Sequence, residues 1–111
     1  MNWAGFPHLK ELPPPPYWAA IFLSERGEDL AGYAEMDLAT IQAAQQVNGF
    51  LGYASLKQGE VGMFISYWSS REAIENWRMN TLHLSAKRMG KTKWYERYVS
   101  QLAEVQQHGI K

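Results

Sequence analysis

The chain has 111 residues, the length of a single domain, and its 46% of hydrophobic residues supply enough apolar surface for a packed globular core. Eleven basic and eleven acidic side chains cancel, which argues against nucleic acid or an anionic membrane as a partner. The chain contains no cysteine, so disulfides, thiolate metal sites and a cysteine nucleophile are excluded.

Neither a targeting signal nor a membrane span is evident in the sequence. Residues 1–10 lack a basic stretch followed by an apolar core, and no apolar run reaches the roughly 18 residues that span a bilayer. We therefore expect a cytoplasmic protein with no membrane partner. Charge is unevenly distributed: residues 1–65 carry three basic and seven acidic side chains, and residues 66–111 carry eight and four. The two halves could attract each other, or a second copy of the chain.

The first 16 residues are expected to form an extended arm. Pro13 to Pro16 fix φ, donate no backbone hydrogen bond and favour a polyproline II path. Such a run can also be an SH3 or WW ligand, but a stiff segment leading into a strand is the simpler interpretation. The predicted domain therefore covers residues 17–107, and residues 108–111 form a short tail.

The next two segments are predicted to be a strand and a helix. Tyr17 to Ser24 is short and apolar on both alternating faces, as in a buried strand. From Leu30 onward, apolar residues recur at spacings of three and four, which predicts a helix. Asn48 and Gly49 are suited to its C-terminal cap.

A hairpin and a second helix are predicted to follow. Residues 50–56 and 61–68 are rich in aromatic and aliphatic residues, and the polar segment 57–60 between them favours a hairpin turn. Ser69 or Ser70 can cap the next helix, which is predicted to run to about Met89, with a break near residues 80–81 as an option.

The last stretch, residues 94–106, fits two periodicities. A helix would align Trp94, Tyr98, Leu102 and Val105, whereas a strand would place Tyr95, Val99, Ala103 and Val105 on one face. Periodicity alone does not decide between them. If the stretch is a strand, the element order is β-α-β-β-α-β, the α+β ferredoxin-like arrangement.

Several segments, taken in order, resemble one known family. They are NGFLGY at residues 48–53, ISYW at 65–68, EAIENW at 72–77 and GKTKWYERY at 90–98. Together they resemble the antibiotic biosynthesis monooxygenase family over about residues 17–107. The resemblance implies a ferredoxin-like βαββαβ unit whose sheet pairs with that of a second copy in a dimeric α+β barrel. It also implies that residues 94–106 form the final strand.

The resemblance further implies a chemistry and its residues. Relatives that oxidise phenolic polyketides are thought to need no flavin or metal, because the substrate supplies the electrons as a carbanion after it loses a proton. The implied function is a cofactor-independent monooxygenase acting on a small aromatic or polycyclic phenol. Trp77 would line the pocket, and His83 and Arg97 would be catalytic. Ala73 departs from the pattern, because quinone-forming members carry asparagine there.

Aromatic side chains offer candidate substrate-binding residues. Tyr67, Trp68, Trp94, Tyr95 and Tyr98 form a set that could clamp a planar ligand, and Tyr67 and Trp94 are taken as substrate-binding candidates beside Trp77. Each candidate has a simpler explanation. The aromatic side chains could fill the core or the dimer interface. Likewise, His83 could be a partly exposed helix histidine bonded to the backbone.

Cofactor sites are not indicated by the sequence. In haem-degrading relatives the iron-ligating histidine lies ten residues after the helix tryptophan, but that position here is Lys87, and an ammonium group cannot ligate iron. No metal-binding or acyl-transfer motif is present. We therefore expect no cofactor, no metal and no haem degradation. The alternative function is a non-catalytic dimeric module that binds a small molecule or serves a stress response.

Overall fold

The computed structural model describes residues 12–80 and 94–110 of the chain. Within them, the elements in chain order are β1 (Tyr17–Arg26), α1 (Tyr33–Gln45), β2 (Phe50–Gln58), β3 (Val61–Trp68), α2 (Arg71–Arg78) and β4 (Tyr95–Val105). The strands form one sheet in the order β2-β3-β1-β4, and every neighbouring pair is antiparallel. This α+β ferredoxin-like arrangement confirms the predicted fold class.

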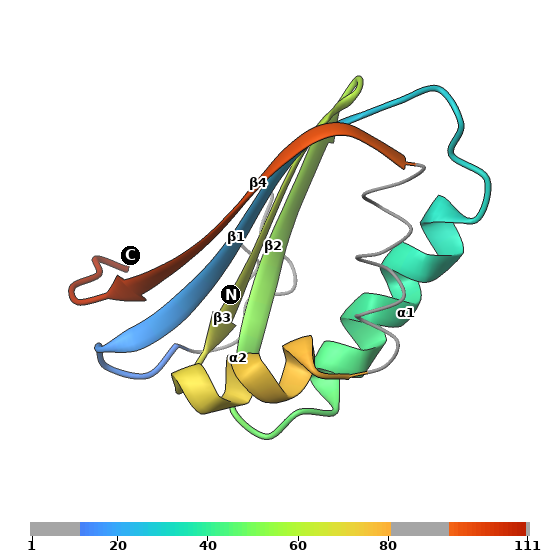
Figure 1. The fold of residues 1–111 in the computed structure, drawn as a ribbon. Coiled ribbons are helices and arrows are strands. Elements are labelled where there is room, and N and C mark those ends of the chain that lie inside the picture. The colour runs from blue at the N-terminus through green and yellow to red at the C-terminus, as the bar shows by residue number, and fades with distance from the viewer. Residues whose placement is uncertain (1–11, 81–93, 111) are drawn as a thin grey trace.

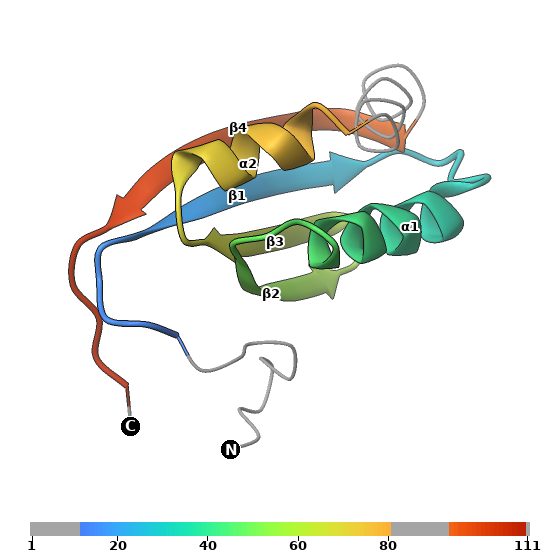
Figure 2. The same cartoon turned by 90° about the horizontal axis from the view of Figure 1, so that it is seen from below.

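Both described helices lie on the same side of the sheet (Figure 1). Side chains alternate along β1, so Trp18 and Ala20 contact the core beneath the helices, whereas Leu23 belongs to the face that no described helix covers. In the view of Figure 2 the strands follow one another from top to bottom as β4, β1, β3 and β2, the order of the sheet read from its other edge. None of the helices in residues 12–80 and 94–110 combines the length and apolar character that crossing a membrane requires.

The core is centred on two tryptophans between α2 and the sheet. Trp68 is fully buried, and its ring stacks on that of Trp77 with centroids 5.1 Å apart and planes inclined by 29°. The Trp68 Nε1–H donates to Ser66 Oγ over 2.8 Å, so the polar atom of this buried ring is satisfied. Ala44 on α1 and both Ala73 and Ile74 on α2 complete the cluster.

The first helix begins later than the sequence predicted. Asp29 Oδ1 accepts a hydrogen bond from Ala31 N, which makes a turn, and Gly32 then adopts a left-handed φ of 80° as the N-cap. Helix α1 therefore starts at Tyr33, and Leu30, predicted to begin its apolar stripe, is 40% exposed. The helix also ends early, at Gln45, because residues 47–49 form a turn that leads into β2.

The second helix starts at one of its two candidate caps. Ser70 is the N-cap, and its Oγ accepts from the backbone N of Ala73 over 3.1 Å. Helix α2 ends at Arg78, with Met79 as its C-cap. The predicted continuation to Met89 falls on residues 81–93, outside the described part of the chain.

The final stretch is a strand, as the family resemblance implied. The prediction that Tyr95 shares a face with Val99, Ala103 and Val105 is wrong for Tyr95. A register shift between Glu25 and Arg26 interrupts the pairing of β1 with β4, where Tyr95 pairs with Arg26. Because of this bulge, Tyr95 lies on the side that faces the helices, whereas Val99 lies on the opposite face. The strict alternation assumed from the sequence would have placed both on one face.

A side chain at Gly49 would meet both backbone strain and close neighbours. Its φ is +104°, and a Cβ atom there would lie 2.7 Å from Ser69 Oγ and 2.9 Å from Ala73 Cβ. We expect Gly49→Ala to lower the free energy of unfolding by about 2–4 kcal/mol, from backbone strain and overpacking together. Gly59 is the matched control, because its φ is +59° but nothing lies within 4 Å of a built Cβ.

Gly59→Ala therefore carries the strain of a left-handed residue alone, which costs about 1–2 kcal/mol. Urea unfolding followed by circular dichroism measures both variants under the same conditions. Equal losses for Gly49→Ala and Gly59→Ala would contradict the close packing of the 47–49 turn against Ser69 and Ala73.

Candidate functional site

A cavity of about 150 Å³ lies between the helix-bearing face of the sheet and α1. A cavity of this size accepts a ligand about as large as one benzene ring. Its walls come from β1, α1, β2, β3, α2 and β4, and include the aromatic side chains of Phe22, Tyr33, Phe64, Trp77, Trp94 and Tyr95. Such a lining suits a flat, largely apolar molecule.

Two tryptophans of the wall are fixed by hydrogen bonds to backbone oxygens of the α1 region. Trp94 is 3% exposed, and its Nε1 donates to Ala31 O over 3.0 Å, while Trp77 Nε1 donates to Thr40 O over 3.4 Å. The ring of Tyr33 meets that of Trp94 edge to face, with centroids 5.6 Å apart. These contacts hold the aromatic wall in place before any ligand enters.

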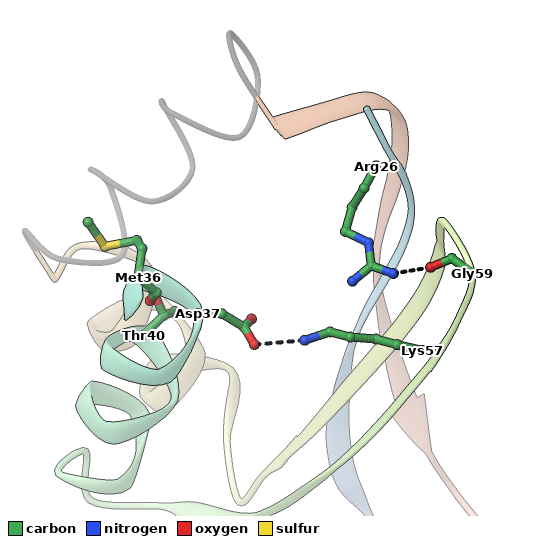
Figure 3. Close-up of polar contacts among 6 residues, drawn as sticks. All are labelled: Arg26, Met36, Asp37, Thr40, Lys57 and Gly59. Atoms are coloured by element: carbon green, nitrogen blue, oxygen red, sulfur yellow. Dashed lines mark hydrogen bonds and ion pairs between the residues drawn. The ribbon is translucent and has the colours of Figure 1, made fainter. Parts of the chain in front are cut away.

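One end of the cavity is charged. Lys57 Nζ on β2 forms an ion pair with Asp37 Oδ2 on α1 over 3.0 Å, and both residues line the cavity. Figure 3 shows Lys57 reaching from the sheet towards α1. The same ammonium lies 5.2 Å from the centre of the Tyr33 ring, and the Arg26 guanidinium lies 5.6 Å from it. Arg26 also donates to Gly59 O at the β2–β3 turn.

Tyr95 places a neutral phenol in the cavity wall. Burial raises its pKa far above the ordinary value, and the neighbouring Tyr33, through its charge and a side-chain hydrogen bond, raises the pKa further. Arg26 acts in the opposite direction, but more weakly. The Tyr95 hydroxyl therefore stays protonated at neutral pH, so it can take part in hydrogen bonds but is not a base.

Of the five predicted site residues, Trp77 and Trp94 line this cavity. Tyr67 does not, because it lies on the helix-free face, where its ring packs edge to face on Tyr17 at 6.1 Å. Its predicted role in substrate binding receives no support from this cavity. His83 falls within residues 81–93, outside the described residues.

Arg97 also lies away from the cavity. Its side chain is 77% exposed and pairs with Glu25 Oε2 over 2.9 Å, across from it in the sheet. The hydrogen bond and charge of Glu25 raise the pKa of Arg97. The physical reason is strand alternation: residues that pair with Glu25 share its face, and that face is opposite to the helices. The catalytic role of Arg97 stays a prediction.

The site contains residues that the sequence did not single out. The sequence predicts a turn at Lys57, but β2 continues to Gln58, so Lys57 shares the helix-bearing face with Tyr53 and Ser55. Asp37 lies 20 residues earlier, on α1. The alternation of residues 53, 55 and 57 was the available signal, while the approach of Asp37 depends on how the helix packs.

The structure also bears on metal binding and on Ala73. In residues 12–80 and 94–110, no group of three or more His, Cys, Asp or Glu side chains is placed to hold a metal ion. Ala73, the departure from the family pattern, is 3% exposed and belongs to the core rather than to the cavity wall.

The helix-free face carries a second feature, an apolar row across the sheet. Leu56, Met63, Leu23 and Val99 occupy one register row that crosses all strands from β2 to β4. Their exposed fractions are 61%, 38%, 38% and 51%. An exposed apolar surface that spans a whole sheet is typical of a contact with another protein. We call these four residues the open-face row.

Comparisons with known proteins gave one relative by sequence and many by structure. The Bacillus subtilis protein YqjZ, which is uncharacterized, is 40% identical over 98 residues, covering 87% of this chain and 86% of YqjZ. No family model matches the chain.

Solved structures of the same fold include an established oxygenase. SnoaB, a cofactor-independent oxygenase from Streptomyces nogalater, superposes with a TM-score of 0.67 at 10% identity, covering 86% of this chain and 97% of SnoaB. A candidate antibiotic biosynthesis monooxygenase from Nitrosomonas europaea gives a TM-score of 0.67 at 9% identity, covering 78% of this chain and 95% of that protein. The ferredoxin-like βαββαβ unit implied by the sequence resemblance is thereby confirmed.

Proposed function

The chain belongs to the family of Bacillus subtilis YqjZ and has the fold of the antibiotic biosynthesis monooxygenases, and on this premise we propose that it is a cofactor-independent monooxygenase of a small phenol. The observation that carries the proposal is the aromatic cavity between the sheet and α1, with Trp77 and Trp94 in its wall. A pocket for such a reaction must bind a flat phenol, keep its oxygen ionised and exclude water.

The proposed reaction draws all its electrons from the substrate. A phenol with an activated CH₂ group loses a proton from carbon, and the resulting carbanion adds to O₂ to form a C–O bond. The peroxide anion takes up a proton, and the hydroperoxide then loses water to leave a carbonyl. One substrate and one O₂ give one ketone or quinone and one water. The protein's part is to hold the ring, accept the proton and stabilise the anion.

Residue roles follow from position and chemistry. Trp77 and Trp94 are proposed to hold the ring of the substrate, since both are fixed in the cavity wall by hydrogen bonds. His83 is proposed as the base, because an imidazole exchanges protons near neutral pH. A base of this kind contributes about 10²–10⁴-fold to a rate.

Oxygen uptake tests the proposal. The dialysed protein, with a chelator present, is expected to consume oxygen when a one-ring phenol with an activated CH₂ group is added. His83→Ala is expected to lower that rate at least about tenfold while leaving the circular dichroism spectrum unchanged. His108→Ala is the matched control, because His108 belongs to the C-terminal tail and contacts Tyr17 at the helix-free face. Uptake that His83→Ala does not change would remove His83 from the mechanism.

A non-catalytic small-molecule-binding module is the second candidate. The replacement of the family's asparagine by Ala73 favours it, since the relatives that form quinones carry the amide at that position. Binding of phenols without any substrate-dependent oxygen uptake would establish this candidate and exclude the first.

The protein is further proposed to act as a homodimer in the cytoplasm. The open-face row supports the dimer, because a second copy of the same sheet could cover it, as the family resemblance implies. Arg97 and Glu25 lie next to this row, so a dimer would place their ion pair at its border.

A further inference from the structure

The position of Lys57 on β2 gives its ammonium group access to the cavity. Lys57 pairs in the sheet with Gly62, which has no side chain to obstruct it. A Cβ atom at Gly62 would lie 3.8 Å from Lys57 Cγ and 3.2 Å from Ser24 Oγ. Glycine at this position therefore leaves room for the lysine stem to run along the sheet towards the cavity.

The charges at this end of the cavity favour an anion. The charged residues that line the cavity are Lys57, Arg78 and Asp37, and Asp37 is the carboxylate paired with Lys57, whereas Arg78 pairs with Glu75 on α2. An ammonium group has three N–H donors, and Asp37 accepts one of them. Arg26 does not line the cavity, but its guanidinium lies 5.6 Å from the centre of the Tyr33 ring in the cavity wall. The cavity lining thus holds one more cation than carboxylates, and the Lys57 ammonium has donors beyond the one that Asp37 accepts.

From this arrangement we infer that Lys57, held by Asp37, binds the ionised oxygen of a one-ring hydroxyarene whose ring lies against the aromatic wall. The inference deepens the proposed function and rests on it, because it names the group that would stabilise the phenolate. Asp37 is a positioning residue, since it fixes the ammonium and is not expected to touch the ligand.

The geometry supports the inference in two ways. The cavity, at about 150 Å³, limits the ligand to a small ring system. Its lining combines apolar and polar groups, because Trp77 and Trp94 line the same cavity as Lys57 and Tyr95. Tyr95 stays neutral, so its hydroxyl can serve as a second hydrogen-bonding group for the ligand oxygen without repelling it.

The test uses 4-nitrophenol, which ionises near neutral pH and turns yellow as the anion. Absorbance of the bound ligand is recorded against pH with excess wild-type protein. We expect its pKa to fall by about one unit or more, equal to about tenfold tighter binding of the anion than of the neutral phenol, since an opposite charge at about 4–6 Å has this effect. 4-Nitroanisole, which cannot ionise, reports ring binding alone.

Variants then assign the shift. Lys57→Met is expected to return the pKa of bound 4-nitrophenol to the free value or above, because burial without a cation disfavours the anion. Lys57→Arg keeps the charge and is expected to keep most of the shift. The Lys57 side chain is 39% exposed, so losing its ion pair should not unfold the protein, and Lys57→Gln provides a second neutral variant. Arg71→Met, on α2 and outside the cavity wall, is the matched control.

The outcomes separate this inference from the proposed reaction. Absence of 4-nitrophenol binding, a shift that Lys57→Met and Lys57→Gln leave intact, or a shift abolished by Arg97→Met instead would overturn the assignment of Lys57. A Lys57-dependent shift in a protein that consumes no oxygen with any phenol would support the anion site while refuting the oxygenase. Oxygen uptake without a Lys57-dependent pKa shift of bound 4-nitrophenol would support the oxygenase and refute the anion site.

Discussion

Leu23→Asp is expected to dissociate the proposed dimer. Leu23 lies between Met63 and Val99 in the open-face row, near the middle of the helix-free face. In a symmetric dimer each substitution occurs twice, so two buried leucines are lost and two carboxylates are placed in an apolar contact. Loss of the leucine burial alone, about 1.5–3 kcal/mol for each side chain, weakens association by about 10²–10⁴-fold.

Sedimentation velocity at micromolar concentration measures this change. The wild type is expected to sediment as a dimer and Leu23→Asp as a folded monomer. Leu38→Asp is the matched control, because Leu38 is a leucine 57% exposed on α1, away from the helix-free face, and should leave the dimer intact. A monomeric wild type would refute the dimer, and equal behaviour of the two variants would refute the role of the open-face row.

Trp77→Ala is expected to cause a large loss of stability. Trp77 is 6% exposed, stacks on the fully buried Trp68 and packs with Ile74 in the core cluster. Removal of a buried tryptophan side chain costs about 3–5 kcal/mol, which approaches the total stability of many small domains. Trp77→Phe keeps an aromatic ring on Trp68 and should cost distinctly less.

Urea unfolding measures both variants, with Met79→Ala as the control. Met79 follows Trp77 closely but is 69% exposed, so its truncation should change the free energy of unfolding by no more than about 0.5 kcal/mol. The structure also predicts that folded Trp77→Phe binds 4-nitroanisole more weakly, because the indole forms part of the cavity wall. A loss below about 1 kcal/mol for Trp77→Ala would contradict its place in the core.

Local sequence patterns were sufficient to predict the strands. They predicted the ends of the helices less accurately. Alternation and apolar runs located β1, β2 and β3 within two residues at each end. The start of α1 was predicted too early, because Asp29 and Gly32 form a turn that competes with the first helical turn. For β4, both periodicities fitted, and its pairing with β1 decides the outcome, which no local pattern contains.

A site residue could be predicted from the sequence only where the local helix or strand pattern determines which way its side chain points. Trp77 belongs to an amphipathic helix, so its inward position follows from spacing. Arg97 was expected to face the pocket, but its pairing with Glu25 beyond the bulge places it on the helix-free face. Asp37 and Lys57 meet only because α1 packs beside β2. Contacts of this kind arise from tertiary packing, so the sequence around each residue does not reveal them.

Incorporation of isotopic oxygen tests the central claim most directly. The dialysed protein is incubated under ¹⁸O₂ with a phenol that supports oxygen uptake, and product and water are analysed by mass spectrometry. The proposed reaction predicts one ¹⁸O atom in the product carbonyl and one in water for each substrate consumed, after correction for carbonyl exchange with solvent. Full product formation without ¹⁸O in the product, or a rate that vanishes on dialysis and returns with added flavin or metal, would contradict a cofactor-independent monooxygenase.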